Sequence, residues 1–250
     1  MMAFTIAGRE LRSLFLSPMA WAILAVVSGI CAWFFLVYLD FFLQIQPRLA
    51  AVPGGSGAAD IVVAPLFSTA ATVLLLVVPL LTMRLISEER RAQTLSLLLS
   101  APVSMTEIVL GKFLGVLGFV LVMLLLIAAM PLSLLAGGTL DLGLWATGVL
   151  GLLLLLASFC SIGLYLSTLT AQPLVAAVST FGLLLLLWIL NLASTGADNK
   201  GLLDYLSLMS HFQPLLRGIF NSTDIAYYLL LIGTFLVLSI RRLDADRLQH

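Results

Sequence analysis

Residues 142–197 form an uninterrupted stretch without a single charged side chain. At an α-helical rise of 1.5 Å per residue the stretch would be about 80 Å long, whereas the hydrocarbon core of a bilayer is about 30 Å thick. A polar break that ends in proline divides the stretch at residues 167–173. The stretch therefore predicts two membrane-spanning helices folded back on each other, over about residues 143–167 and 173–194.

Four further apolar runs are long enough to cross a bilayer, which takes roughly 20 residues. The expected spans cover about residues 19–39, 65–86, 108–137 and 222–240. The sequence thus predicts an all-α integral membrane protein with six transmembrane helices, and we expect residues 1–250 to form a single transmembrane domain.

The composition excludes a soluble enzyme. Only 10% of the residues are charged and 62% are hydrophobic, whereas a soluble domain carries about 25% charged residues. The 12 basic and 12 acidic residues cancel, which argues against a nucleic-acid partner. Cys31 and Cys160 both lie in apolar runs, so we expect buried thiols and no disulfide.

The chain carries no catalytic or energy-supplying motif. HExxH, GxSxG and Walker A patterns are all missing from the sequence, and the two histidines, His211 and His250, are too few for a typical metal centre. No ionisable residue lies well inside an apolar run, which argues against ion-coupled transport. We expect no directly bound cofactor, and a partner must supply any energy.

Basic residues near the spans predict the orientation, because Lys and Arg favour the cytoplasmic side. With both termini cytoplasmic, most of them lie inside: Arg9, Arg12, Arg84, Arg90, Arg91, Lys112, Arg241, Arg242 and Arg247. Only Arg48, Lys200 and Arg217 then lie outside. The opposite topology reverses this ratio, so we expect both termini in the cytoplasm.

Residues 4–15 are predicted to form an amphipathic helix in the cytoplasmic membrane interface. One face is apolar, with Phe4, Ala7, Leu11, Leu14 and Phe15. The other face is polar, with Thr5, Arg9, Arg12 and Ser13. The alternative is a frayed cytosolic tail.

The inner loop between the second and third spans predicts a short helix across the membrane face. Ser87 is suited to cap its start, and Glu88 and Glu89 suit its first turn. An apolar stripe follows, and residues 101–102, Ala-Pro, end the helix. Ser104 and Glu107 then match a capping box that opens the third span. The pattern fits a docking helix and a solvated linker equally well.

The two outer segments lead to different predictions. Residues 40–64 contain Pro47, Pro53 and a Gly-rich run, which predict a flexible surface loop. Residues 194–224 show helical spacing with a break at Pro214, which predicts two short helices tucked into the outer leaflet or over the outer mouth. Gating and simple packing both remain open for these helices.

Three small residues at the start of the third span permit close helix contact: Gly111, Gly115 and Gly118. Such a surface fits a seam between two copies of the chain and equally a contact within one chain.

Residues 80–112, LLTMRLISEERRAQTLSLLLSAPVSMTEIVLGK, resemble the corresponding stretch of type-2 ABC transporter permeases. The shared features are an acidic–basic cluster, a Thr-Leu pair, a Pro-Val-Ser turn and a Gly-Lys pair, found here at residues 88–91, 94–95, 102–104 and 111–112. Family members often have Gly before the threonine, where this chain has Gln93. Residues 211–228 look like the gliding-motility-type branch.

The resemblance implies a permease in the bacterial cytoplasmic (inner) membrane that works as a homodimer or heterodimer and docks a separate cytoplasmic ATP-binding subunit, which alone would bind ATP and Mg. The coupling helix would cover residues 88–101. Its polar contacts would come from Glu88, Glu89, Arg90 and Arg91. Its apolar contacts would come from Thr94, Leu95, Leu98 and Leu99. The opening helix would pack nearby through Arg9, Leu11, Arg12 and Phe15.

Two functions follow from this resemblance. In the first, the protein exports an amphipathic or lipid-like substrate, which mildly suits its uncharged spans. In the second, it is a mechanical transmitter that drives a periplasmic or membrane partner without passing a substrate.

Overall fold

The computed structural model describes residues 2–49, 57, 59–93, 104–136, 140–194 and 205–248. Every regular element in these ranges is a helix. Within these ranges six helices are long and apolar enough to cross a membrane, which confirms the predicted all-α fold with six candidate spans. They are α2 (Pro18–Leu49), α3 (Ala64–Thr82), α6 (Met105–Leu132), α7 (Leu142–Leu169), α8 (Pro173–Ser194) and α11 (Ser222–Leu248). The shorter helices are α1 (Met2–Leu16), the π-helix η1 (Ala59–Val63), α4 (Ser87–Arg91), the 3-10 helix η2 (Ser133–Ala136) and α10 (Leu208–Leu216).

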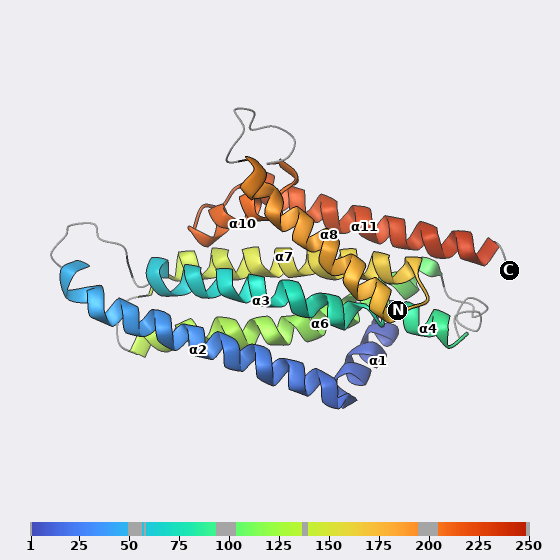
Figure 1. Cartoon of the computed structure of the whole chain (residues 1–250), viewed down its shortest axis with the longest axis horizontal. Helices are drawn as coiled ribbons and strands as arrows, with labels where there is room; N and C mark the ends of the chain where they lie inside the picture. The colour runs from blue at the N-terminus through green and yellow to red at the C-terminus, as the bar shows by residue number, and fades with distance from the viewer. Residues whose placement is uncertain are drawn as a thin grey trace.

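The long helices divide into an inner group and a peripheral group. In the inner helices α3, α6 and α7, between 50% and 67% of the most apolar stretch is buried, whereas in α2, α8 and α11 only 17–22% is buried. Helix α7 contacts α3, α6, α8, α10 and α11, and is therefore the centre of the bundle (Figure 1). The exposed apolar faces of the peripheral helices suit contact with lipid or with other transmembrane helices.

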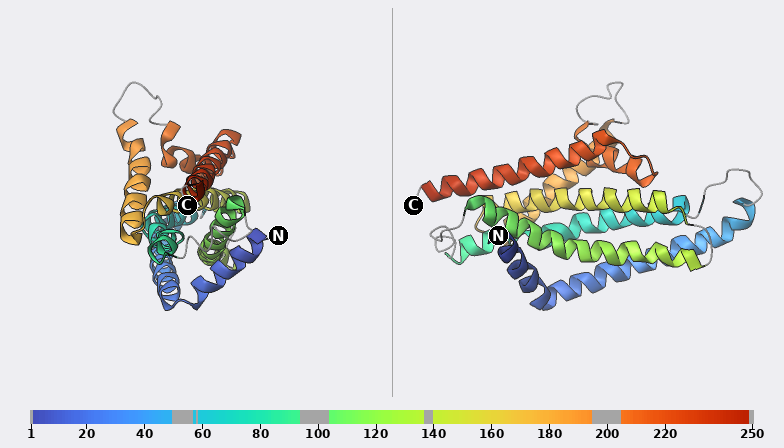
Figure 2. Two further views of the ribbon diagram at one scale, coloured as in Figure 1. Left: turned by 90° about the vertical axis from the view of Figure 1, so that its right-hand side faces the viewer. Right: turned by 180° about the vertical axis from the view of Figure 1, so that it is seen from behind.

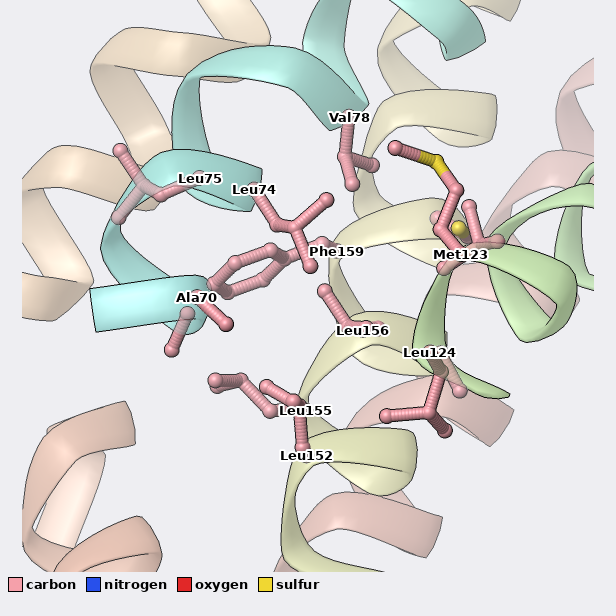
Figure 3. Packing of buried hydrophobic residues seen from close by; sticks show 14 of the residues in the cluster. Ala70, Leu74, Leu75, Val78, Met123, Leu124, Leu152, Leu155, Leu156 and Phe159 are labelled. Carbon is pink, nitrogen blue, oxygen red and sulfur yellow. The ribbon is translucent and has the colours of Figure 1, made fainter. Parts of the chain in front are cut away.

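The core lies where α3, α6 and α7 meet (Figure 3). Leu74 on α3 and Phe159 on α7 are fully buried, and Met123 reaches the same cluster from α6. Glycine allows closest approach between α3 and α7, because a Cβ on Gly163 would lie 2.1 Å from the hydroxyl oxygen of Thr82. The hydrophobic effect contributes little to association of helices that are already surrounded by lipid. Close packing of this kind holds the helices together instead.

Several helix boundaries differ from the sequence-based prediction. Helix α2 continues past residue 39 to Leu49, so the predicted loop at residues 40–64 is wrong for residues 40–49 and for η1. The apolar run continues through Phe41, Phe42 and Leu43, and Gln44 donates to Asp40 one turn earlier at 2.8 Å. Proline is tolerated at residue 47 because it lies close to the end of the helix.

Two further helices end at positions that differ from the ends of the predicted spans. Helix α3 ends at Thr82 rather than at residue 86, and a turn leads from it into α4. Helix α11 runs to Leu248 rather than stopping at residue 240, and Arg242 pairs with Asp246 across one turn of the extension at 3.7 Å. The predicted capping box is confirmed, since the Ser104 hydroxyl accepts from the Glu107 backbone N–H at 3.2 Å.

The predicted outer helices are found in part. Helix α10 lies between α8 and α11 in sequence, and residues 195–204 fall outside the described residues. The predicted break at Pro214 is wrong, because α10 includes this residue and ends only at Leu216. Cys31 and Cys160 are both buried free thiols, as predicted.

Candidate functional site

Helix α4 lies at the end of the bundle where both chain termini lie (Figures 1 and 2). It follows α3 after a four-residue turn, residues 83–86, and it contacts α7 and α8. The helix has only five residues. An isolated helix of that length is not stable in water, so side-chain contacts with the neighbouring helices must hold it.

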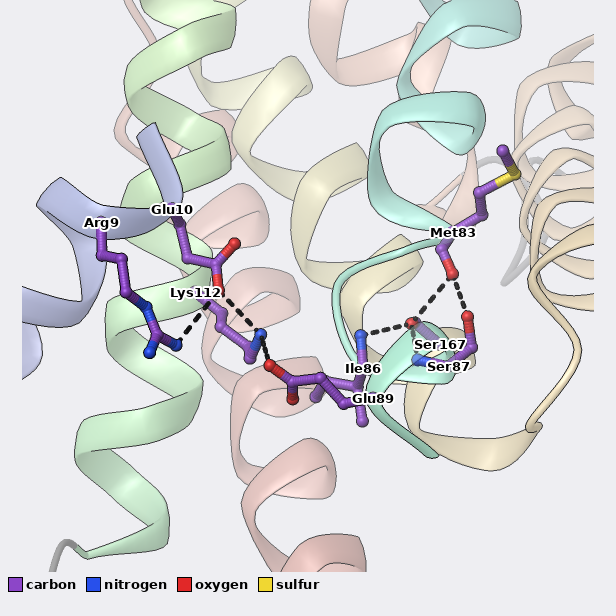
Figure 4. Close-up of polar contacts among 8 residues, drawn as sticks. All are labelled: Arg9, Glu10, Met83, Ile86, Ser87, Glu89, Lys112 and Ser167. Carbon is purple, nitrogen blue, oxygen red and sulfur yellow. Dashed lines mark hydrogen bonds and ion pairs between the residues drawn. The ribbon is translucent and has the colours of Figure 1, made fainter. Parts of the chain in front are cut away.

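The start of α4 is capped from α7 rather than by its own serine. Ser167 on α7 accepts hydrogen bonds from the backbone N–H groups of Ile86 and Ser87, each at 3.0 Å (Figure 4). The predicted capping role of Ser87 is wrong, because Ser87 stands inside the first turn and its hydroxyl donates back to the Met83 carbonyl. A distant hydroxyl thus fastens α4 to the central helix.

A buried lysine joins α4 to two other helices. Lys112 on α6 is only 2% exposed. Its Nζ donates to Glu10 of α1 at 2.9 Å and to Glu89 of α4 at 2.7 Å (Figure 4). A cation removed from water is tolerated only when it is paired and hydrogen-bonded. The three side chains therefore link α1, α4 and α6 as one unit.

The α1 helix can approach α6 closely because of two glycines. A Cβ on Gly111 would lie 2.7 Å from the Cβ of Ile6, and a Cβ on Gly115 would lie 2.6 Å from the Cβ of Glu10. The glycine surface therefore serves a contact within the chain, which decides between the two interpretations of the sequence for these positions. Phe15 of α1 adds an edge-to-face contact with Phe119 of α6, with ring centroids 5.3 Å apart.

A further ion pair ties α4 to the last helix. Arg90 pairs with Asp246, which lies in the part of α11 beyond the predicted span. We call Glu10, Glu89, Arg90, Lys112 and Asp246 the charged junction. Together with Ser167 it connects α4 to α1, α6, α7 and α11.

The predicted docking residues differ in their surroundings. Glu88 and Arg91 are exposed, whereas Glu89 and Arg90 are half-buried and paired within the chain. The predicted groove-filling residues Thr94, Leu95, Leu98 and Leu99 lie outside the described residues. In α1, Arg9 and Arg12 are exposed, and Leu11 and Phe15 pack against the core. The docking role of these residues and the position of α1 in the membrane interface stay predictions.

The site predicted from the sequence did not include four residues that hold α4 in the structure: Glu10, Lys112, Ser167 and Asp246. One signal was available for Lys112, because it is the only cation in the sequence of α6 and must find acidic partners if it is buried. The sequence does not indicate which acidic residues those are, since Glu10 lies 102 positions away along the chain.

The opposite end of the molecule holds a second polar cluster, between α10 and α11. His211 Nδ1 lies 2.7 Å from Asp224 Oδ1, and His211 Nε2 lies 3.0 Å from the Tyr205 carbonyl oxygen. Tyr227 and Tyr228 donate to the carbonyls of Leu206 and Leu208 at 2.8 and 2.9 Å. These bonds fasten α10 and the residues just before it to α11, and both packing and gating remain open for this region.

One comparison with known proteins gives a match. A family model described as "ABC-2 family transporter protein" matches residues 4–247. The matched range begins in α1 and ends in α11, so it includes all six spans and the whole charged junction. No curated protein matches the sequence.

Proposed function

Because the chain belongs to the ABC-2 family of transporter proteins, we propose that it is the permease subunit through which a separate cytoplasmic ATP-binding subunit drives transport. The family membership and the six apolar helices make it a multi-pass membrane protein. The proposal adds that the end with α4 faces the cytoplasm of a bacterial inner membrane, and that ATP and Mg bind only to the partner. The excess of basic residues at that end supports this orientation.

The observation that carries the proposal is the attachment of α4 to four other helices. Displacement of α4 by a partner is transmitted to α6 and α1 through Lys112, to α7 through Ser167, and to α11 through Arg90. A short helix held in this way moves with its neighbours, whereas an unattached linker dissipates the movement. We therefore assign α4 as the rigid start of the coupling element.

The exposed side chains of α4 are the ones that remain for a partner. Glu88 and Arg91 are both exposed, and in our proposal they contact the ATP-binding subunit. Glu89 and Arg90, which pair within the chain, fasten the element in place. Residues 94–99 continue the docking surface, as their resemblance to the family implies.

Transport would take place between this chain and a second copy or a paralogue. The peripheral helices α2, α8 and α11 present exposed apolar side chains along their length, which suits both lipid and a second permease. The polar groups of the described span interiors are mostly serine and threonine, so an amphipathic or lipid-like substrate fits them better than an ion.

The test is copurification from native membranes in mild detergent, with bound partners identified by mass. We expect a stoichiometric ATP-binding subunit with the wild-type chain and at least about tenfold less with Arg91→Glu, because an exposed charge at an interface is reversed. Arg217→Glu is the matched control, since Arg217 is exposed at the opposite end of the molecule. Equal recovery with both variants would contradict docking through α4. Two results together would favour the mechanical transmitter: an additional periplasmic protein in the purified complex, and ATP hydrolysis without export when the complex is placed in vesicles.

A further inference from the structure

A cavity of about 470 Å³ lies beside the charged junction, among α1, α2, α3, α4 and α6. Its volume falls within the range of about 300–1,000 Å³ that is typical of small-molecule sites. The α1 and α2 helices form a V on one side of it, and α3 leads into α4 on the other (Figures 1 and 2). Of the residues that line this cavity, only Glu88 also belongs to the proposed docking surface for the ATP-binding subunit.

The lining of the cavity is divided into a charged part and an apolar part. The charged part has three cations and three carboxylates, namely Arg9, Arg84, Lys112, Glu10, Glu88 and Glu89. The apolar part includes Leu14, Met19, Ala20, Ile23, Leu80 and Leu81. An occupant that matches both parts must be amphiphilic, with a polar head and a hydrocarbon body.

The arginines at the mouth remain available for the head of such an occupant. On the deep side, Lys112 is already paired with two carboxylates. Arg9 and Arg84 are exposed; Arg9 approaches Glu10 only to 3.9 Å, and Arg84 has no ion pair within the part of the chain that the structure describes. Arginine binds phosphate through paired N–H donors, so these two side chains, which line the same cavity, suit a phosphate group.

The charge balance of the cavity favours a zwitterionic head. The three cations and three carboxylates cancel, and Glu88 stands exposed beside the arginines. A phosphate with a tethered ammonium places its anion near Arg9 and Arg84 and its cation near Glu88. A purely anionic head would leave Glu88 facing a second negative charge.

The position of the cavity along the spans fits a membrane lipid. Trp21, in the first turn of α2, is 56% exposed, and its indole N–H donates to the Phe15 carbonyl at 2.7 Å. Exposed tryptophans of this kind concentrate at the membrane–water interface. Ile23 lies further along α2, and Leu80 lies within α3, so the apolar part of the cavity extends toward the hydrocarbon.

We propose that this cavity binds one zwitterionic glycerophospholipid, with its phosphate between Arg9 and Arg84 and an acyl chain along Ile23, Leu80 and Leu81. The lipid fills the space between the α1–α2 elbow and the α3–α4 turn, and so braces α4. The binding is a property of the permease alone and does not depend on the ATP-binding subunit.

The test uses the purified full chain in maltoside micelles with phosphatidylethanolamine that carries a diazirine on one acyl chain. After illumination, we expect labelled peptides that contain Ile23 or Leu80–Leu81. The double variant Arg9→Gln, Arg84→Gln should reduce this labelling at least about tenfold, since each basic residue near a lipid head contributes on the order of a fivefold gain. The control Arg12→Gln, Arg91→Gln removes the same charge from α1 and α4 outside the cavity and should label as the wild type does.

A second variant tests the space itself. Ser13 is exposed and lines the cavity, so Ser13→Trp obstructs it without altering the buried core, and labelling should fall. Equal labelling in the wild type and both cavity variants would overturn the proposal. Competition by unlabelled phosphatidylethanolamine supports it. Equal or better competition by phosphatidylglycerol would overturn the zwitterionic head, and displacement by inorganic phosphate would indicate a free-anion site instead of a lipid site.

Discussion

The polar contacts at one end of the molecule differ from those at the other end. At the α4 end, several polar contacts join residues that lie far apart in the chain: Lys112 reaches Glu10 over 102 positions and Arg90 reaches Asp246 over 156, although Lys112 and Glu89 are only 23 positions apart. At the opposite end, the bonds of His211, Tyr227 and Tyr228 span only 6 to 21 positions. The first set connects the whole bundle, whereas the second fastens one short helix to its neighbour. We therefore expect the polar contacts of α4 to carry a displacement to more helices than the polar contacts of α10 do.

The largest effect should follow from Lys112→Met. The change leaves Glu10 and Glu89 half-buried without the cation between them, and breaking such a pair by removing one partner costs about 3–5 kcal/mol. We expect a strongly lowered unfolding temperature in detergent. Tryptophan fluorescence during heating measures it.

Its control is the triple variant Glu10→Gln, Glu89→Gln, Lys112→Met. Since replacement of a complete buried charge cluster is often close to neutral, the triple variant should recover most of the lost stability. An unchanged unfolding temperature in Lys112→Met would contradict the role assigned to the charged junction.

A smaller effect, about 1–3 kcal/mol, is expected for Asp224→Ala at the opposite end. The change removes the carboxylate that faces His211 and leaves a buried polar group without its partner. Stability is measured in the same detergent assay, with Asp224→Asn as the control that keeps an acceptor and loses less. If Asp224→Ala also abolished recovery of the ATP-binding subunit, the effect of this change would not be confined to its own end of the molecule. The contrast drawn between the two ends would then be wrong.

Alanine substitutions at the α6 glycines that face α1 should differ in their cost to stability. Gly111→Ala forces its new Cβ against Ile6 and the Ala3 carbonyl oxygen at 2.7–2.9 Å, which should cost about 1–3 kcal/mol. Gly118→Ala meets only the end of the flexible Leu11 side chain, at 3.3 Å, and should cost less than about 1 kcal/mol. Disulfide trapping between α1 and α6 reports the displacement directly, and equal trapping in both variants would refute close packing at Gly111.

The smallest effect is expected for Arg90→Gln. Arg90 is 22% exposed whereas Lys112 is only 2% exposed, so water reaches the Arg90 cation and the loss should be about 1 kcal/mol, well below that for Lys112. The loss should shrink further at high salt, since the pair is reached by counterions. Unfolding temperatures of the wild type and the variant across a salt series test this, and a salt-independent loss of several kcal/mol would show a buried pair.

The sequence predicts those features that depend on local pattern. The number of spans, the capping box at Ser104 and the free thiols of Cys31 and Cys160 follow from apolar length or from neighbouring residues. The charged junction does not, because several acidic residues are available to Lys112 and only the packing of α1 on α6 selects Glu10. The role of Ser167 is equally unpredictable from the sequence, since Ser167 caps a helix that begins 80 positions earlier.

The most direct test of transmission through the charged junction is a distance measurement in the assembled transporter. Spin labels at Phe41→Cys and Ile219→Cys stand on exposed positions of α2 and of the segment after α10, away from α4, while Cys31 and Cys160 are buried. We expect ATP to shift the interspin distance in the wild-type background and to leave it unchanged in the Glu10→Gln, Glu89→Gln, Lys112→Met background, although that chain still binds the ATP-binding subunit. The same shift in both backgrounds would show that the movement reaches the far end without the charged junction.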